Sequence, residues 1–311
     1  MRIAVAYDGA ADGAATPDTA AVLDAVRATV AALAGAGHDA FPIAAAVPLD
    51  RFFARLGAVD LVFNLVEGLD GRAAEEPRVA ALIELSRRPV TGASSETLGL
   101  CRRKDRVNAL LAAAGLPIPA WTLVRPGRGA DDWARFPAIV KPAGEDGSVG
   151  IDDQSIVEDA IELRAALERC PGDALVQRFV GGRELNVGIV GEVVLPVAEV
   201  AFSHARRLVS YAAKWEPGSD ADLGTRPLCP APIDAAVADR ARDLGLRAWR
   251  AVGGHGYGRV DLRADDDGRL HVLEVNPNPD LAPDAGLARM AAAAGWTFDA
   301  LVARIVEDGL R

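Results

Sequence analysis

Hydrophobic and polar positions follow two alternating periods over the first hundred residues. Short apolar runs alternate with longer segments whose apolar residues recur at helical spacing. The pattern predicts three strands and three helices, in the order strand 2–7, helix 17–37, strand 39–44, helix 51–57, strand 60–67 and helix 76–88. Strands and helices in this rhythm are typical of a parallel sheet covered by helices. We therefore expect an α/β region at the start of the chain.

Beyond residue 95 the pattern changes. A helix ends at Gly115, and Pro117 and Pro119 follow it, which suits a hinge between two regions. The next segment predicts a small α+β unit with strand 138–144, helix 158–170 and strands 174–180 and 184–191. The rest of the chain predicts strands 193–202 and 206–214, a loop over 216–232, helix 234–253, a hairpin within 256–278 and a closing helix 298–309.

The hairpin segment GYGRVDLRADDDGRLHVLEVNPN has two acids, an arginine and an asparagine among its apolar residues. A four-residue turn at Asp265–Gly268 would place Arg259 opposite Glu274 and Asp261 opposite Val272. Period-two alternation then assigns one face to the polar residues Arg259, Asp261, Glu274 and Asn276. The other face takes the apolar residues Val260, Leu262, Leu273 and Val275. Two prolines, Pro277 and Pro279, then end the strand.

The polar face of this hairpin has the chemistry of a divalent-metal site. Carboxylate and amide oxygens such as those of Asp261, Glu274 and Asn276 are hard ligands that suit Mg²⁺, which takes phosphate and water as its other ligands. The alternative is a structural ion pair between Arg259 and Glu274 in a half-buried sheet. That alternative accounts for neither the second acid nor the asparagine, so the pattern favours magnesium.

Composition narrows the classes of partner. The 311 residues carry a net charge of −10, and 50% of them are hydrophobic. An acidic chain without a basic cluster does not suit nucleic-acid binding, and no apolar run approaches the ~20 residues that span a bilayer. Three widely spaced cysteines favour neither disulfides nor zinc. We expect a cytoplasmic protein that acts on small molecules, with no nucleic acid and no membrane among its partners.

Only three of the 34 basic residues are lysines, namely Lys104, Lys141 and Lys214. A chain so biased toward arginine keeps lysine either where a compact ammonium is needed or by chance at the surface. Lys141 directly precedes the segment PAGEDGSVG, whose glycines would let backbone N–H groups approach phosphate oxygens. The segment is not a Walker A loop, because the sequence GxxxxGK[ST] is missing. This combination predicts phosphate binding near Lys141.

The order of these motifs resembles the ATP-grasp superfamily and, within it, the D-alanine–D-alanine ligase family. The similarity extends from about residue 60 to the end of the chain and includes all three lysines. It rests on the segments RRKDRVNALLAAAGLPIPAW, FPAIVKPAGEDGSVGI, ALVQRFVGGREL, SYAAKW, CPAP, GYGRVDLR and HVLEVNPNP. The resemblance implies an ATP-grasp fold of the α/β (α+β) class, with a Rossmann-like N-terminal domain at 1–95 and two lobes that clamp ATP at 96–187 and 188–311.

The resemblance implies a nucleotide role for each matching residue. The lysines and the glycine-rich loop would hold the phosphates, Phe179 and Val180 would form the hinge that holds adenine, and Glu184 would bind the ribose hydroxyls. Gln177 stands where the family usually has a glutamate, and its amide oxygen can still accept from the adenine amino group. The implied ATP-binding residues are Lys104, Lys141, Gly147, Ser148, Gln177, Phe179, Val180, Glu184 and Lys214.

The chemistry that the resemblance implies is ATP-dependent amide formation. One carboxylate attacks the γ-phosphate to give an acyl phosphate and ADP, and an amine then displaces phosphate. The implied ligands of two Mg²⁺ ions, with Mn²⁺ as a substitute, are Asp261, Glu274 and Asn276. The implied catalytic residues, which steady the reacting carboxyl and the transferred phosphate, are Arg259, Lys214 and Ser148.

Three departures from the family fall on the substrate side. The segment YDGAADGAATPDTA lacks the Ser-x-Glu whose acid holds the amino group of the first D-alanine. Asp280 stands where the family has an oxyanion-hole glycine, and PDAG replaces a serine-containing stretch. We therefore predict an amino-acid substrate other than D-alanine. The candidate substrate residues are Asn64, Glu67, Tyr211, Trp215 and Asp280, with a strand-end cap and a solvated loop acid as the alternative roles.

Other functions fit parts of the same pattern. One is a genuine D-alanine–D-alanine ligase, and another is an ATP-grasp phosphotransferase or carboxylase that stops at phosphoryl transfer. A third is a nucleotide-binding regulatory protein without turnover. Dependence of ADP formation on an added amine separates the ligases from the others. The expected partners are small carboxylate and amine substrates, and a homodimer through the N-terminal lobe would fit the family.

Overall fold

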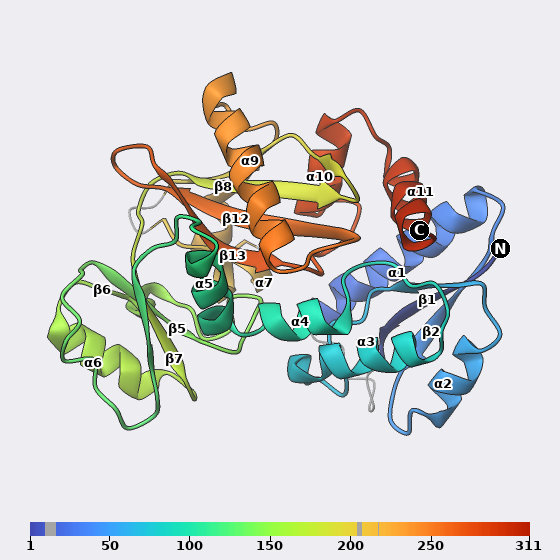
Figure 1. Cartoon of the computed structure of the whole chain (residues 1–311), viewed down its shortest axis with the longest axis horizontal. Helices are drawn as coiled ribbons and strands as arrows, with labels where there is room; N and C mark the ends of the chain where they lie inside the picture. Colours follow the sequence, from blue (N-terminus) through green and yellow to red (C-terminus); the bar gives the residue numbers. More distant parts are fainter. Residues whose placement is uncertain (10–16, 204–206, 217) are drawn as a thin grey trace.

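The computed structural model describes residues 1–9, 17–203, 207–216 and 218–311. They form three sheets covered by helices (Figure 1), which confirms the mixed helix and sheet class. Within these ranges no helix combines the length and the apolar character needed to cross a membrane. The third sheet already begins at Glu184, so the proposed domain boundary after residue 187 falls inside its first strand.

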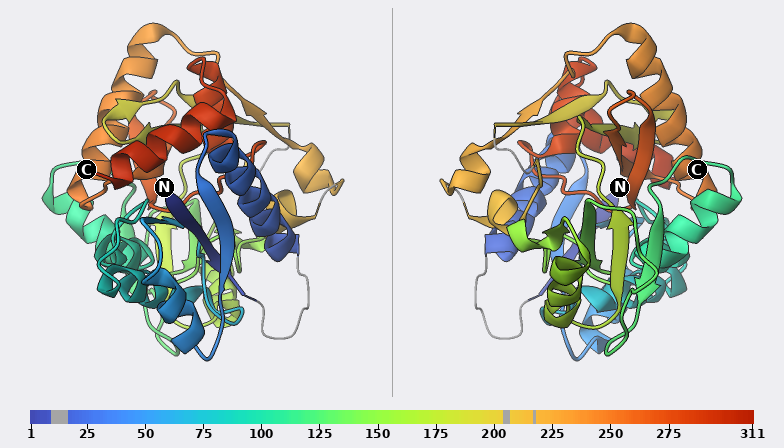
Figure 2. Two further views of the ribbon diagram at one scale, coloured as in Figure 1. Left: turned by 90° about the vertical axis from the view of Figure 1, so that its right-hand side faces the viewer. Right: turned by 90° about the vertical axis from the view of Figure 1, so that its left-hand side faces the viewer.

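The first sheet is parallel, as the sequence predicts, with β1 between β2 and β3. Its elements are β1 (Arg2–Asp8), α1 (Pro17–Gly35), β2 (Asp39–Ala45), α2 (Asp50–Leu56), β3 (Leu61–Asn64), η1 (Ala73–Glu75) and α3 (Glu76–Leu85). Ile3 of β1 and Leu33 of α1 share a buried cluster with Ile305 of α11 (Phe298–Gly309). The last helix of the chain therefore packs beside α1 on this sheet (Figure 2).

The second sheet is antiparallel, in the order β4-β7-β5-β6. The elements of this region are α4 (Ser95–Cys101), α5 (Lys104–Ala113), β4 (Trp121–Val124), β5 (Ala138–Pro142), η2 (Asp153–Ser155), β6 (Ile156–Val157), α6 (Ala160–Arg169) and β7 (Ala174–Arg178). Val140 of β5 packs in one apolar cluster with Leu163 of α6. Because neighbouring strand residues point to opposite faces, Ile139 and Lys141 lie on the face away from α6.

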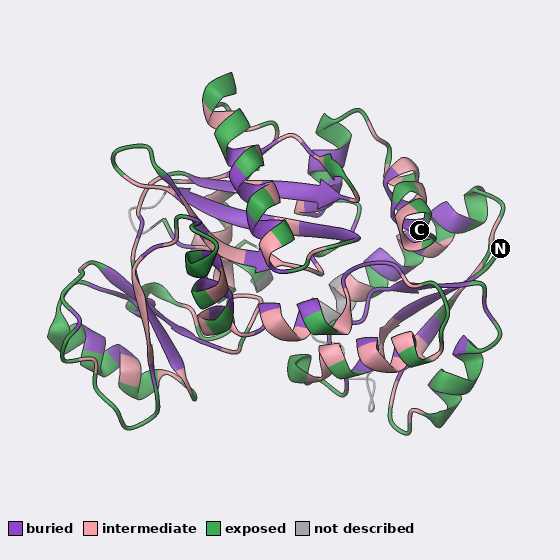
Figure 3. Ribbon diagram, viewed as in Figure 1, coloured by how far each residue is buried: buried purple, intermediate pink, exposed green. Residues whose placement is uncertain are grey.

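The third sheet has the path β11-β10-β8-β12-β13, and β9 pairs with β8. The elements of this region are β8 (Glu184–Val190), β9 (Val193–Val194), β10 (Ala198–Phe202), α7 (Tyr211–Trp215), α8 (Asp220–Leu223), β11 (Thr225–Leu228), α9 (Ala235–Ala251), β12 (Tyr257–Ala264), β13 (Leu270–Asn276) and α10 (Gly286–Ala293). Leu244 of α9 packs on Val187 and Val260. β8 and β12 are mostly buried at the centre (Figure 3).

The hairpin of β12 and β13 has the predicted polar face, but the predicted register is wrong. Ala264 pairs with Leu270, so the turn has one residue more than expected. A bulge then shifts the register, with Asp261 opposite Glu274 and Leu262 opposite Val272. Leu273 is the extra residue at this bulge. Val272 therefore takes the core position that we predicted for Leu273, while the four polar residues keep a common face.

Three other element predictions need correction. The strand expected over 206–214 is a helix at its end, α7, because the Ser210 side chain accepts a hydrogen bond from the backbone N–H of Ala213 and so caps a helical turn. The loop expected over 216–232 contains α8 and β11, and β11 pairs with β10. The strand expected over 193–202 divides into β9 and β10.

Candidate active site

The polar face of the third sheet centres on the carboxylate of Asp261, which is 5% exposed. The Nε and Nη2 atoms of Arg259 donate to its two oxygens at 2.7 and 2.9 Å. Asn186, its neighbour on β8, donates from Nδ2 at 2.8 Å. Asn276 donates from Nδ2 to Asp261 at 3.0 Å and to Glu274 at 3.4 Å. The face therefore gathers two carboxylates around one amide.

This donor set fits a magnesium ion. The two carboxylates lie within hydrogen-bond reach of the same Asn276 amide, and rotation of that amide would present its oxygen in place of its nitrogen. Two carboxylates with an amide oxygen are hard ligands that leave positions for water and phosphate. Within the described ranges, no group of three His, Cys, Asp or Glu side chains could hold a metal, and the candidate set here consists of two acids and one amide.

The three lysines of the chain all act on Glu274. Burial alone would raise the pKa of this carboxyl, but the charges of Lys104, Lys214, Lys141 and Arg259 lower it to about 2. These lysines come from α5, β5 and α7, three segments far apart in sequence. The charges of the lysines that the sequence singles out therefore all act on the predicted metal face.

Lys141 is buried, with 7% of its surface exposed, and the carboxyl of Glu274 contributes to its surroundings. Desolvation is the main cause that lowers its pKa to about 8, and Lys104 and Arg263 lower it further. Lys104, which is 8% exposed, donates from Nζ to the carbonyl oxygen of Glu145 and, at 3.1 Å, to Asp146. Two ammonium groups are thus held beside the glycine-rich segment.

The glycine-rich segment 144–150, here called the glycine loop, turns sharply at its end. Gly147, Ser148 and Gly150 have φ values of 64°, 63° and 73°, in the left-handed region where glycine carries no steric cost. Arg102 holds the loop, since it donates to the carbonyl oxygen of Gly144 at 2.8 Å and to Asp146 at 3.3 Å. Sequence reasoning missed Arg102, although it lies two residues before Lys104.

Residues 207–216, here called the lid segment, pack on the glycine loop. Ser148 donates from Oγ to the carbonyl oxygen of Val209 at 2.9 Å, and the N–H of Tyr211 donates to Ile151 at 3.1 Å. Leu208 is buried against Ile139 and Ile156. The side chains of Tyr211 and Lys214 are exposed on this segment, and that of Trp215 lies outside the described part of the structure. The lid segment and the glycine loop therefore contact one another.

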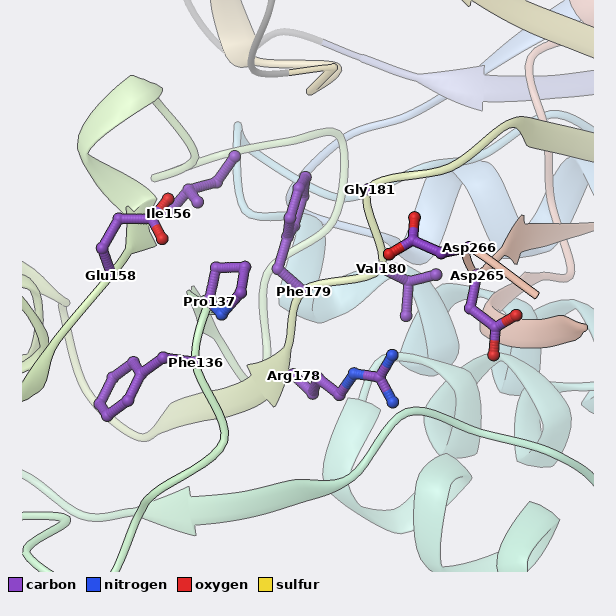
Figure 4. A pocket seen from close by; sticks show the side chains of 10 residues that line it. All are labelled: Phe136, Pro137, Ile156, Glu158, Arg178, Phe179, Val180, Gly181, Asp265 and Asp266. Carbon is purple, nitrogen blue, oxygen red and sulfur yellow. The ribbon is translucent and has the colours of Figure 1, made fainter. Parts of the chain in front are cut away.

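The predicted nucleoside end lies where β7 leads into β8. Its pocket is lined by Phe136, Pro137, Ile156, Glu158, Arg178, Phe179, Val180, Gly181, Asp265 and Asp266 (Figure 4). Gln177 is 1% exposed, and its Nε2 is a buried donor without a partner among the described atoms, whereas the predicted adenine contact uses its amide oxygen. Burial raises the pKa of Glu184, while the charge of Arg263 lowers it. The sequence did not single out Arg263.

The predicted substrate residues lie in two places. Tyr211 and Trp215 belong to the lid segment, and Asn64, Glu67 and Asp280 lie outside it. Asn64 is buried, and its Oδ1 accepts from the N–H of Val66 at 3.2 Å, which is the geometry of a strand-end cap. Glu67 is exposed, and its N–H donates to Asp8 at 2.7 Å. Asp280 accepts from the N–H of Ala282 at 2.8 Å, and burial of its carboxyl raises the pKa of Asp280. The segment in which the family has its Ser-x-Glu motif includes residues 10–16, which lie outside the described residues.

The side chain of Asn278 joins the first sheet region to the third, near the predicted substrate residues. Its Nδ2 donates at 3.0 Å both to the carbonyl oxygen of Val66 and to Glu76, and its Oδ1 accepts from the hydroxyl of Tyr257 at 3.1 Å. Burial is the main cause that raises the pKa of Glu76 to about 8. Sequence reasoning named neither Glu76 nor Asn278, although Asn278 stands between the two conspicuous prolines.

Comparison with known proteins identifies relatives over most of the chain. Residues 110–307 match the family model described as the C-terminus of D-ala D-ala ligase. The chain is 33% identical to D-alanine–D-alanine ligase of Cereibacter sphaeroides over 303 residues, with 95% of this chain and 93% of the relative covered. It is also 33% identical to the uncharacterized protein y4sG of Sinorhizobium fredii over 255 residues, which cover 79% of this chain and 74% of the relative.

Solved structures share the fold. D-alanine–D-alanine ligase of Bacillus anthracis complexed with ATP superimposes with a TM-score of 0.80 at 22% identity, over 100% of this chain and 98% of that protein. The VanG D-Ala:D-Ser ligase of Enterococcus faecalis gives 0.78 at 21% identity, over 99% of each chain. The predicted ATP-grasp architecture is therefore confirmed at the level of the fold.

Proposed function

Because the chain belongs to the D-alanine–D-alanine ligase family of ATP-grasp ligases, we propose that it joins a carboxylate to the amine of an amino acid with hydrolysis of ATP to ADP and phosphate. The observation that carries this proposal is that the charges of Lys104, Lys141 and Lys214 all act on the carboxyl of Glu274, whose neighbour Asn276 also bonds to Asp261. A site where three ammonium charges act on a carboxylate that shares an amide with a second carboxylate suits a nucleoside triphosphate bound together with a metal ion.

Phosphoryl transfer comes first in the proposed reaction. The substrate carboxylate attacks the γ-phosphorus of ATP, the bond to the β,γ-bridging oxygen breaks, and ADP leaves an acyl phosphate behind. Lys104 and Lys141 neutralise the phosphate oxygens from beside the glycine loop, and Lys214 does so from the lid segment. Asp261, Glu274 and Asn276 would hold magnesium, as two ions in our proposal, and the bound metal would supply further charge neutralisation. Manganese serves as a substitute ion.

Amide formation follows at the acyl carbon. The amine attacks the carbonyl, a tetrahedral oxyanion forms, and its collapse expels phosphate. Arg259 is placed for this step, because Nε and Nη2 are engaged by Asp261 while Nη1 is outside that ion pair. In this proposal Ser148 and the lid segment keep water from the acyl phosphate, which is supported by the hydrogen bond that joins Ser148 of the glycine loop to Val209 of the lid segment.

The substrate is proposed to differ from D-alanine. Asp280 replaces the family glycine near Arg259, and its charge reaches that guanidinium. A carboxylate at this position favours a substrate with an additional ammonium or other cationic group. Glu67 brings a further acid to the same side of the molecule, since the charges of Glu67 and Asp280 both act on Tyr257. A named D-Ala:D-Ser ligase of the same fold supports variation of the second substrate in this architecture.

The names of the relatives favour the second candidate, a genuine D-alanine–D-alanine ligase. A regulatory protein without turnover finds less support, because the lysines, both acids and Asn276 are all in place. The homodimer also remains a proposal, which light scattering of the purified protein would test.

Hydroxylamine trapping tests the proposed mechanism. Incubation with ATP, magnesium and a substrate amino acid in hydroxylamine should give an acyl hydroxamate and an equal amount of ADP, because hydroxylamine replaces the amine at the acyl phosphate. Omission of both hydroxylamine and the amine should slow ADP release. ADP release without hydroxamate in the presence of every amino acid tried would contradict the ligase mechanism and favour a phosphotransferase.

A further inference from the structure

Arg263 is a buried arginine at the nucleoside end, in the middle of the third sheet. Only 2% of its surface is exposed. Its Nε and Nη2 atoms donate to Oε2 of Glu184 at 3.0 and 2.6 Å, and Nη1 donates to the carbonyl oxygen of Val180 at 3.1 Å. Nη2 also donates to the carbonyl oxygen of Arg207 in the lid segment. One guanidinium thus contacts the hinge, the predicted ribose acid and the lid.

Aromatic rings fix the plane of this guanidinium. Its central carbon lies 5.5 Å from the ring centroid of Phe179 and 5.1 Å from that of Phe202, which come from the hinge and from β10. Such cation–π contacts add to the hydrogen bonds and restrict the rotamer. The group therefore has two ring contacts in addition to its hydrogen bonds.

A buried ion pair of this kind is poorly explained by stability alone. Removing two charges from water costs several kcal/mol, and an apolar residue of similar size often serves the fold as well or better. Arg263 and Glu184 face one another in register across β12 and β8, in the strand row next to the row of Asp261 and Asn186. The pair therefore extends the polar face of the metal site toward the predicted ribose position.

We infer that Arg263 is a positioning residue for the nucleotide, one that orients Glu184 so that this acid reads the ribose hydroxyls. Both guanidinium bonds to the acid end on Oε2, so the other oxygen, Oε1, is not engaged by Arg263. A carboxylate held by one oxygen can accept hydroxyl protons with the other at little cost in side-chain entropy. This inference rests on the proposed function and makes the site selective for ribonucleotides over 2′-deoxyribonucleotides.

Nucleotide binding tests the role of Arg263 without turnover. Calorimetry with magnesium would compare ADP with 2′-deoxyADP on the wild-type protein and on Arg263→Met. The wild type should prefer ADP by about tenfold or more, since 2′-deoxyADP lacks the hydroxyl that would bond to the charged carboxylate of Glu184. Arg263→Met should weaken ADP binding by about tenfold and reduce the preference to about twofold or less. Arg263→Lys, which keeps the charge but loses the planar fork, should fall between them.

Arg183→Met is the matched control. Arg183 also donates to a carboxylate with two nitrogens, Nε at 2.7 Å and Nη2, and it directly precedes Glu184 in the chain, but its partner is Glu199. This variant should keep the full preference for ADP. If Arg263→Met does not fold, as judged by circular dichroism, Arg263→Lys decides the question by the same ratio.

The outcomes separate this inference from the proposed function. An ADP to 2′-deoxyADP ratio that stays at the wild-type value in the folded Arg263 variants would overturn the role of Arg263 and leave the ligase proposal intact. An equal loss of preference in Arg183→Met would also overturn it, because the effect would then belong to any ion pair of this strand. A wild-type protein that binds neither nucleotide would overturn both proposals.

Discussion

Glu274 is the residue on which the charge balance of the site depends. Glu274→Gln keeps the volume but removes the charge that Lys104, Lys141 and Lys214 share, and it weakens the proposed metal site. We expect the rate of ADP release to fall by about 100-fold or more, in the range seen when a single transition-state contact is lost. Steady-state kinetics at saturating ATP would measure the change. Glu168→Gln, at an exposed carboxylate of α6, is the control and should leave the rate intact.

The buried ammonium of Lys141 should make the free energy of unfolding depend on pH. Its pKa falls from an unfolded value of 10.5 to about 8 in the folded protein, so burial of the ammonium opposes folding below pH 8 and this cost disappears as the pH rises toward 10.5. Lys141→Met should therefore be more stable than the wild type at pH 7 by roughly 3 kcal/mol, and the gap should close near pH 10. Urea unfolding at both values would measure it.

The exposed lysine of the lid segment provides the control for that experiment. Lys214→Met should change the unfolding free energy little at either pH, since its side chain is exposed. A stability gap for Lys141→Met that stays constant from pH 7 to pH 10 would contradict a buried ammonium at Lys141. Lys141→Met should also raise KM for ATP.

At the scale of single residues, the sequence revealed the lysines of the site but not its arginines. Lysine is so rare in the chain that all three lysines drew attention, and the structure places their charges around one carboxylate. Arg102 and Arg263 were hidden, because arginine is common here and their roles depend on contacts with segments distant in sequence. No composition or spacing signal distinguishes them from the surface arginines.

At the scale of elements, the lid segment depends on a short capped helix. α7 has five residues, and the side chain of Ser210 accepts from the N–H of Ala213 at 3.3 Å. Ser210→Ala should cost about 1 kcal/mol of helix stability, which favours an open lid and raises KM for ATP by about fivefold. Kinetics at limiting ATP would show this change.

A second helix cap supplies the comparison. Thr297 caps α11 by the same bond, from the N–H of Ala300 at 3.1 Å, far from the glycine loop. Thr297→Ala should therefore lower stability by a similar amount with KM for ATP unchanged. Equal KM values for both cap variants would show that α7 does not govern access of ATP.

Element prediction succeeded where one period repeats and failed where a single residue interrupts it. The polar face of β12 and β13 follows from alternation, yet the bulge at Leu273 leaves no mark in composition, so the pairing was wrong while the face was right. Residues 206–214 have apolar residues that suit a strand. The structure of the described part, 207–214, is decided instead by the Ser210 cap and by the burial of Leu208 on the second sheet.

At the scale of the whole molecule, Asn278 holds the first sheet region against the third. Asn278→Ala would leave the carbonyl of Val66, the carboxyl of Glu76 and the hydroxyl of Tyr257 without this partner. We expect a loss of about 2 to 4 kcal/mol in the free energy of unfolding. Asn108→Ala is the control, because the Nδ2 of Asn108 is buried without a partner within the described ranges. Equal losses for both variants would contradict a role of Asn278 in docking.

The arrangement of the three sheets was predicted only through resemblance. Alternation indicates the parallel sheet at the start and the hairpin at the end, since both depend on local patterns. The packing of α11 beside α1 joins the two ends of the chain, and no local pattern reports such a contact. The prolines at 277 and 279 marked a rigid strand exit, while the docking role of Asn278 between them became visible only in three dimensions.

The most direct test of the account is ADP release by the wild-type protein over a panel of amino acids, each alone and in pairs, with D-alanine included. We predict that ADP release needs both a carboxylate and an amine substrate, and that a pair with an additional cationic group turns over faster than two molecules of D-alanine. Strong and selective turnover with D-alanine alone would contradict the proposed substrate. ADP release indifferent to every amino acid would contradict the ligase itself.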